Sequence, residues 1–217
     1  MKIKSASFLT SVANKQNLIN SELFEFAFVG RSNSGKSSLI NALVNQKNLA
    51  KTSGTPGLTK LVNYFLINCT EADFKGNKFQ KLINSENEFL PCFFVDLPGY
   101  GYSKAGKFNH ELWSGLIEDY FKFSTSLKCV FVLMDIRHEP SVLDQQMILY
   151  LYSKNIPFKV IATKADKLAK SKINQYVLQM AKTLKITSNN IIATSSENKF
   201  NLNAVLNSLD NFFEKVE

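Results

Sequence analysis

The stretch that decides the fold is FEFAFVGRSNSGKSSLINALVN, residues 24–45. Its first part, Phe24–Val29, is a short apolar and aromatic run, which predicts a buried strand. Its last part, Lys36–Asn45, carries apolar residues at helical spacing. Between them, Gly30–Ser37 matches GxxxxGK[ST], the phosphate-binding loop that joins a strand to a helix. The sequence therefore predicts an α/β fold of the P-loop class.

The residue types in Gly30–Ser37 suit a bound phosphate. Glycines let the backbone approach the phosphate closely, and successive N–H groups can point inward. The helix that begins near Lys36 adds the positive end of its dipole. We expect Lys36 to contact the β and γ phosphates and the Ser37 hydroxyl to bind Mg²⁺.

Strands and helices alternate along the rest of the chain. Further strands are predicted at Leu61–Ile67, Pro91–Val95, Cys129–Met134, Phe158–Ala162 and Ile191–Ala193. Helices are predicted at His110–Phe123, Val142–Ser153, Ile173–Leu184 and Leu202–Phe213. This alternation favours a mostly parallel sheet with helices on both faces. The sequence has no internal repeat and no Pro- or Gly-rich linker, so we expect a single domain over residues 1–217.

A second motif, Asp96–Gly99 (DLPG), follows one of the predicted strands. An acidic residue at the end of a buried strand can hold Mg²⁺ through water, as the second acid of P-loop enzymes does. Gly99 can offer its backbone N–H to the γ-phosphate and can act as a pivot. We therefore expect this motif to form the phosphate end of the site.

A third motif, Thr163–Asp166 (TKAD), also follows a strand. The Asp166 carboxylate can accept two hydrogen bonds from the N1–H and N2–H₂ edge of guanine. Adenine lacks this donor pair, so Asp166 selects GTP and argues against an ATP-using kinase. We expect Lys164 to lay its stem along the base or the ribose. Ser195–Ser196, after the last strand, can offer backbone N–H groups to guanine O6.

A fourth segment, Thr55–Thr59 (TPGLT), lies between the first helix and the second strand, where a switch loop belongs. We expect the Thr59 hydroxyl to complete the Mg²⁺ shell and to sense the γ-phosphate. Thr52 and Thr55 are the alternatives for this role.

The composition limits the partners and the location of the chain. The net charge is +8 and the pI is about 9.3, which favours contact with a polyanion such as rRNA. Arg31 and Arg137 are the only arginines, so a generally lysine-rich composition is the alternative explanation. The three cysteines have no CxxC spacing, which argues against zinc or a disulfide framework. Residues 1–20 lack the apolar core of a signal peptide, so we expect the chain in the cytoplasm. We also expect it to be a monomer.

One segment departs from the regular alternation. Residues 68–90 (NCTEADFKGNKFQKLINSENEFL) are polar, mixed in charge and longer than most connections between strands. The two flanking strands both have a site-proximal end at the same edge, so we expect them to be antiparallel neighbours. Residues 68–90 then form a surface insert, as a longer hairpin or a mobile loop, away from the nucleotide.

Taken together, GRSNSGKS, SGTPGLT, DLPGYGYS, TKAD and the Ser195–Ser196 pair resemble the EngB (YihA/YsxC) family of bacterial GTPases. The resemblance implies a Ras-like α/β domain with a six-stranded sheet. It implies Mg²⁺-dependent GTP binding, slow hydrolysis, a role in large ribosomal subunit assembly and a requirement for normal cell division and septation. It also supports Thr59 as the Mg²⁺ ligand and Thr194–Ser196 as the loop near guanine, although an aromatic residue is common where this chain has Thr194. The family usually has a short hairpin in place of residues 68–90.

Hydrolysis is expected to be slow for a second reason. Ras-type enzymes place a Gln after DxxG to orient the attacking water, and this chain has Tyr100 there. The sequence thus favours a GTPase switch that binds a ribosomal assembly intermediate. The alternative is a regulatory GTP-binding protein of the division machinery with incidental hydrolysis.

We expect the catalytic residues to be Lys36, Thr59 and Gly99, and the metal ligands to be Ser37 and Thr59. The candidate GTP-binding residues are Gly30, Arg31, Ser32, Asn33, Ser34, Gly35, Lys36, Ser37, Gly57, Leu58, Thr59, Lys60, Leu61, Asp96, Leu97, Pro98, Gly99, Thr163, Lys164, Ala165, Asp166, Thr194, Ser195 and Ser196.

Overall fold

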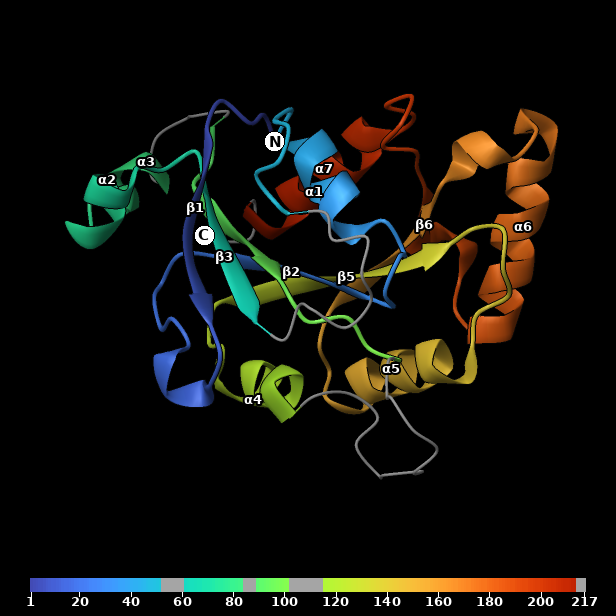
Figure 1. The fold of residues 1–217 in the computed structure, drawn as a ribbon, viewed down its shortest axis with the longest axis horizontal. Helices are drawn as coiled ribbons and strands as arrows, with labels where there is room; N and C mark the ends of the chain where they lie inside the picture. Colours follow the sequence, from blue (N-terminus) through green and yellow to red (C-terminus); the bar gives the residue numbers. More distant parts are fainter. Residues whose placement is uncertain (52–60, 84–88, 102–114, 214–217) are drawn as a thin grey trace.

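The computed structural model of the chain describes residues 1–51, 61–83, 89–101 and 115–213 (Figure 1). Its centre is a seven-stranded sheet in the order β1-β3-β4-β2-β5-β6-β7. The strands are β1 Ala6–Val12, β2 Glu25–Gly30, β3 Val62–Ile67, β4 Cys92–Asp96, β5 Leu127–Asp135, β6 Phe158–Thr163 and β7 Ile191–Ala193. Strands β4, β2, β5, β6 and β7 are parallel neighbours, while β3 is antiparallel to both β4 and β1. The expected mostly parallel α/β sheet is confirmed.

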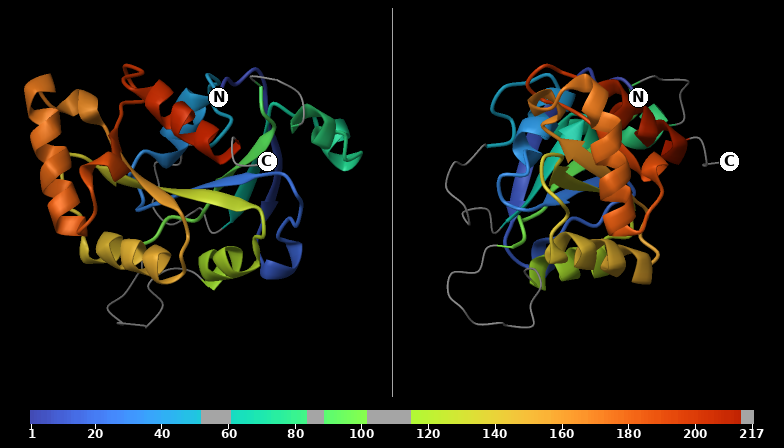
Figure 2. Two further views of the ribbon diagram at one scale, coloured as in Figure 1. Left: turned by 180° about the vertical axis from the view of Figure 1, so that it is seen from behind. Right: turned by 90° about the vertical axis from the view of Figure 1, so that its right-hand side faces the viewer.

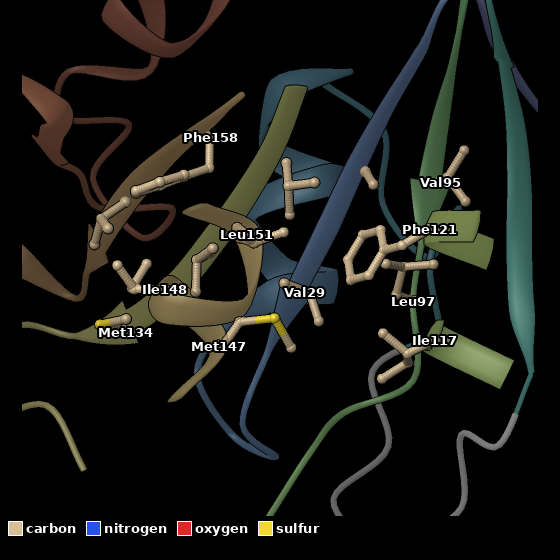
Figure 3. Packing of buried hydrophobic residues seen from close by; sticks show 14 of the residues in the cluster. Val29, Val95, Leu97, Ile117, Phe121, Met134, Met147, Ile148, Leu151 and Phe158 are labelled. Atoms are coloured by element: carbon tan, nitrogen blue, oxygen red, sulfur yellow. The ribbon is translucent and has the colours of Figure 1, made fainter. Parts of the chain in front are cut away.

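Helices cover both faces of this sheet. They are α1 Lys36–Leu43, α2 Glu71–Lys75, α3 Phe79–Ile83, α4 Gly115–Phe123, α5 Val142–Ser153, α6 Lys170–Leu184 and α7 Leu202–Phe213. One core joins the sheet to α1 and α7, and the other joins it to α4, α5 and α6. Figures 1 and 2 show α1 and α7 on one side of the strands and α4 and α5 on the other. In Figure 3, Val29 of β2 lies among side chains from α4 and α5, including Ile117 and Met147.

The seventh strand, β1, was not expected from the sequence. It forms the edge of the sheet and pairs with β3, and six of its seven residues are exposed or only partly buried. Its register shifts between Phe8 and Thr10, so the two-residue alternation of a half-buried strand is interrupted. The irregular pairing explains why Ala6–Val12 shows no clear strand pattern.

The connection between β3 and β4 differs from the expected hairpin extension or mobile loop. The two strands are antiparallel, as predicted, with Asn63 opposite Asp96 and Ile67 opposite Cys92. Between them, however, residues 71–75 and 79–83 form the short helices α2 and α3. The Thr70 hydroxyl accepts a hydrogen bond from the N–H of Asp73 and so caps α2.

The helix α2 is also attached to the sheet. Phe74 packs edge-on against Phe93 of β4, with ring centroids 5.1 Å apart, and Phe79 is buried. Phe74 of α2 and Phe79 of α3 therefore attach both short helices to the core. In Figure 1, α2 and α3 lie at the opposite end of the molecule from the carboxyl ends of β2 and β5.

The parallel strands β2, β4, β5, β6 and β7 end at one edge of the sheet. Strand β2 lies between β4 and β5. The chain continues from β2 to β3 on one side of this strand and from β5 to β6 on the other, so the strand order reverses here. Ligands of open α/β sheets bind outside the carboxyl ends of strands at such a point. None of the described helices combines the length and apolar character needed to cross a membrane.

Candidate nucleotide-binding site

The loop Gly30–Ser37 begins at the last residue of β2 and continues into α1. A Cβ atom on Gly30 would lie 2.7 Å from the Leu133 carbonyl oxygen and 2.7 Å from Ser34 Oγ, so a side chain does not fit there. Gly35 has a φ of 89°, a left-handed conformation that glycine adopts without strain, and it caps the start of α1. The predicted order of strand, loop and helix is confirmed.

The phosphate end of the site joins the first two motifs. The Lys36 ammonium forms an ion pair with the carboxylate of Asp96, and both side chains are largely buried. Asn63 of β3 donates from Nδ2 to Asp96 Oδ2 at 3.4 Å. Ser11 of β1 donates to Asn63 Oδ1 at 2.6 Å. A polar chain thus runs from the edge strand to Lys36, the lysine that we expect to bind phosphate, and sequence reasoning missed Ser11 and Asn63.

The turn after β4 lies along the P-loop. The N–H of Leu97 donates to the Phe28 carbonyl at 2.9 Å, and the N–H of Tyr100 donates to the Gly30 carbonyl at 3.3 Å. Gly99 lies between these anchors, and a Cβ on it would be 3.4 Å from both Gly30 O and Ser32 N. The structure therefore brings Gly99 against the P-loop, as the motif order predicts.

The third motif is tied to the same loop by a hydroxyl and an ammonium group. Thr163 Oγ1 lies 2.7 Å from the Ser34 carbonyl oxygen and 3.1 Å from that of Met134, and its single proton serves one of them at a time. Lys164 has a φ of 61°, and its Nζ donates to the Asn33 carbonyl oxygen at 2.8 Å. Thr163, where common GTPases have Asn, thus still links the third motif to the P-loop.

The carboxylate expected to read guanine is held by the last loop. Ser195 Oγ donates to Asp166 Oδ1 at 2.6 Å, and Lys167 Nζ lies 3.1 Å from Asp166 Oδ2. The hydrogen bond from Ser195 lowers the pKa of Asp166, so the group stays ionised as a double acceptor must. The backbone of Thr194 is joined to the same turn, because Ala165 N–H donates to its carbonyl at 3.0 Å.

Two further residues at this edge were not predicted. Asp135, at the end of β5, accepts hydrogen bonds from Arg137 Nε at 2.9 Å and from Arg137 Nη2 at 2.7 Å, and its carboxylate lies 2.9 Å from Lys164 Nζ. Burial disfavours the charged form of Asp135, but the bonds from Arg137 and Lys164 outweigh burial and hold its pKa well below its usual range. An Asp two residues before one of only two arginines is the signal that could have found this pair.

The second loop of the prediction is only partly placed. Thr52, Thr55, Gly57, Leu58, Thr59 and Lys60 lie outside the described residues. Leu61 directly precedes β3 and is exposed. Ser37 lies in the first turn of α1, and Ser196 follows the buried Ser195. Apart from the residues of that loop, the predicted motifs meet at one edge of the sheet.

Comparison with known proteins adds to this geometry. The profile of a family described as "50S ribosome-binding GTPase" matches residues 25–164. A Clostridium kluyveri protein named "Probable GTP-binding protein EngB" is 42% identical over 200 residues, which cover 92% of this chain and 91% of the relative. The chain belongs to the EngB family of GTP-binding proteins. GTP and GDP are therefore its ligands, and its fold is that of the P-loop GTPases.

Solved structures agree with the EngB assignment at the level of the fold. A crystal structure titled as a probable GTP-binding protein engB superposes with a TM-score of 0.58 at 18% identity, covering 88% of this chain and 99% of that one. Era in complex with MgGDPNP and nucleotides 1506–1542 of 16S ribosomal RNA gives a TM-score of 0.62 at 17% identity, covering 88% and 57%. At these identities the likeness concerns the fold alone.

Proposed function

We propose that this EngB-family chain is a Mg²⁺-dependent GTPase with slow intrinsic turnover, acting as a switch in assembly of the large ribosomal subunit. In this proposal it is also needed for normal cell division and septation. The observation that carries the enzymatic part is the meeting of three motifs at one edge. Lys36 contacts Asp96, Thr163 contacts the Ser34 carbonyl, and Asp166 is held by Ser195.

Guanine recognition falls to the base end of the site. Asp166 accepts hydrogen bonds from N1–H and N2–H₂, and its lowered pKa keeps both oxygens available. Lys164 is held in place by Asp135 and Asn33, which suits a stem that lies along the base or ribose. In this proposal the backbone of Thr194–Ser196 faces guanine O6, and Thr163 and Ala165 also contact the guanine nucleoside.

Phosphate binding falls to the P-loop and Gly99. The Lys36 ammonium has three protons, so it can keep Asp96 as a partner while contacting the β and γ phosphates. The backbone of residues 30–37 surrounds the phosphates, and the Gly99 N–H meets the γ-phosphate. In the proposal, the loop residues Gly57–Leu61 also contact the nucleotide.

The oxygen groups near the phosphate end fit a hard divalent cation. The Ser37 hydroxyl is in the first turn of α1, and the buried Asp96 carboxylate ends β4. Mg²⁺ prefers such oxygen ligands and keeps several of its waters. In the proposal Ser37 and Thr59 bind the ion directly, and Asp96 holds one of its waters. When bound, Mg²⁺ neutralises charge on the β and γ oxygens.

Slow turnover is supported by the position of Tyr100. Its hydroxyl donates to Asp144 Oδ1 at 2.7 Å, and the ring is buried beneath α5. A side chain that is buried in the core with its hydroxyl bonded to Asp144 does not orient a water at the γ-phosphate. Catalysis in this chain then depends on Lys36, Gly99 and Thr59 for positioning and charge stabilisation.

The ribosomal role is supported by family and by charge. The matching family is described as ribosome-binding, and the Era structure of similar fold contains an rRNA fragment. The net charge of +8 favours contact with rRNA phosphates. We propose a cytoplasmic monomer with a single domain, in which residues 68–90 are a surface insert.

Co-sedimentation with ribosomal particles tests the proposed role. We expect the chain to sediment with large-subunit precursors in the presence of a non-hydrolysable GTP analogue and to dissociate with GDP. Binding that depends on lysine–phosphate contacts falls steeply as salt rises. Association that ignores both nucleotide and salt would instead favour the alternative, a GTP-binding regulator of the division machinery.

A further inference from the structure

Tyr100 makes a buried contact that the proposed chemistry does not use. Its ring is 2% exposed, and its hydroxyl donates to Oδ1 of Asp144, which is 4% exposed. Burial, followed by the nearby Asp144 charge, raises the pKa of Tyr100 well above its ordinary value. The phenol therefore keeps its proton near neutral pH and remains a donor.

Asp144 is itself fixed by the start of α5. Its second oxygen, Oδ2, accepts from the N–H of Ser141 at 2.8 Å and from Ser141 Oγ at 2.7 Å. The Ser141 hydroxyl in turn accepts from the N–H of Asp144 at 3.3 Å, which completes a capping box. The two carboxylate oxygens thus have separate tasks, since Oδ2 caps the helix and Oδ1 holds Tyr100.

The backbone around Tyr100 lies between the P-loop and α5. The N–H of Tyr100 donates to the Gly30 carbonyl, and a parallel bridge joins Tyr100 to Arg31. On the other side, a Cβ on Gly101 would lie 3.2 Å from Leu143 Cδ1 of α5. Gly99, one residue before Tyr100, is a position with wide backbone freedom unless its neighbours restrict it.

We propose that Asp144 is a positioning residue of the γ-phosphate site, because it holds the Tyr100 hydroxyl and thereby fixes the backbone of Gly99. The inference rests on the proposed function, in which the Gly99 N–H meets the γ-phosphate. Holding Tyr100 at both its N–H and its hydroxyl reduces the freedom that Gly99 would lose on binding GTP. GDP has no γ-phosphate, so its binding does not depend on this contact.

The test compares Tyr100→Phe with the parent. Phenylalanine keeps the ring in the core and removes only the hydroxyl bond to Asp144. Dissociation constants for a non-hydrolysable GTP analogue and for GDP are measured with Mg²⁺, together with a thermal melt. We expect the analogue to bind about ten-fold more weakly, with GDP binding changed less than about two-fold.

Two further variants separate positioning from helix stability. Ser141→Ala removes the capping hydroxyl but leaves Tyr100 bonded to Asp144 Oδ1. It should lower the melting temperature and leave the ratio of analogue to GDP affinity at the parent value. Asp144→Ala should reduce that ratio as Tyr100→Phe does.

The outcomes decide between distinct accounts. Equal losses for analogue and GDP in Tyr100→Phe, or no loss, overturn the inference. A change of ratio in Ser141→Ala as large as in Tyr100→Phe also overturns it, because capping alone would then explain the effect. Failure of the proposed function looks different, since the parent itself would then show no Mg²⁺-supported binding of the analogue.

Discussion

The base end and the phosphate end of the site differ in what holds them. At the base end, side chains hold side chains, since Ser195 holds Asp166 and Asp135 holds Lys164. At the phosphate end, backbone bonds from Leu97 and Tyr100 hold the turn after β4, together with the single side-chain bond from the Tyr100 hydroxyl to Asp144. The base end lies wholly within the described residues, while the phosphate end includes the proposed Thr59 loop outside them.

This difference has a consequence for substitutions. Removing a side chain at the base end weakens every guanine nucleotide equally, because GTP and GDP carry the same base. Removing a support at the phosphate end changes the preference between GTP and GDP. The ratio of the two affinities therefore reports which end a residue serves.

Asp166→Asn should have the largest effect. The amide loses the charge and one of two acceptors, and hydrogen bonds to charged groups are worth about 1.5–3 kcal/mol each. We expect GTP and GDP to bind at least roughly a hundred-fold more weakly in a titration with labelled nucleotides. Lys167→Met is the control, because Lys167 is half-exposed and its contact with Asp166 contributes little. Unchanged GTP affinity in Asp166→Asn would contradict guanine reading by this group.

Ser195→Ala should come next. The substitution removes the donor that holds Asp166 Oδ1 and the acceptor for the N–H groups of Glu197 and Asn198. We expect both nucleotides to bind about ten-fold more weakly, by the same factor. Ser196→Ala is the matched control, because we assign Ser196 a backbone contact only. A loss of affinity for GTP alone would contradict this assignment, because it would mean that Ser195 serves the phosphate end.

Arg137→Lys should have a smaller effect of the same kind. Lysine cannot reproduce the two-pronged contact that Arg137 makes with Asp135, so Lys164 is held less firmly. We expect GTP and GDP affinities to fall together by about three-fold, measured by the same titration. An increase in the preference for GDP would contradict the assignment of this pair to the base end.

Glu25→Gln should not change nucleotide binding but should change how stability depends on pH. Glu25 begins β2, at the end opposite the P-loop, and is buried against the hydroxyls of Tyr120 and Ser124. Burial raises its pKa to about 7, although the hydrogen bonds from Tyr120 and Ser124 oppose the shift. The folded state therefore binds a proton that the unfolded state has already released.

The sign of this effect follows from linkage. The contribution of Glu25 to stability is complete below the ordinary carboxyl pKa and is lost as pH rises through about 7. Between pH 5 and pH 8 the parent should lose up to about 3 kcal/mol of unfolding free energy because of Glu25, and Glu25→Gln should not show this loss. Urea unfolding of both proteins at the two pH values measures the difference. A parallel pH dependence of parent and variant would show that Glu25 does not titrate in this range.

Sequence patterns predicted where the motifs lie in the fold when the placement depends on short local stretches of sequence. Gly30 and Asp96 end strands, and Lys36 and Asp166 follow strands within short motifs, so their place at one edge follows from parallel strands. The sequence could not show that Asn63 would face Asp96, because that contact depends on the register of β3 against β4.

Contacts between distant segments escaped prediction for the same reason. Asp144 lies 44 residues from Tyr100, and only the folded chain brings the helix start beneath the turn. Asp135 reaches Lys164 because β5 and β6 are adjacent and end together. The short helices at residues 71–75 and 79–83 were not predicted, because their composition is polar and their attachment to the core through Phe74 and Phe79 depends on the fold.

The most direct test of a guanine-specific site with separate ends is a titration of the parent chain with three labelled nucleotides in the presence of Mg²⁺. The account predicts saturable binding of a non-hydrolysable GTP analogue and of GDP, with no comparable binding of ATP. It also predicts that Asp166→Asn weakens the analogue and GDP alike and leaves their ratio unchanged. Binding of ATP as tight as that of GTP by the parent would contradict it.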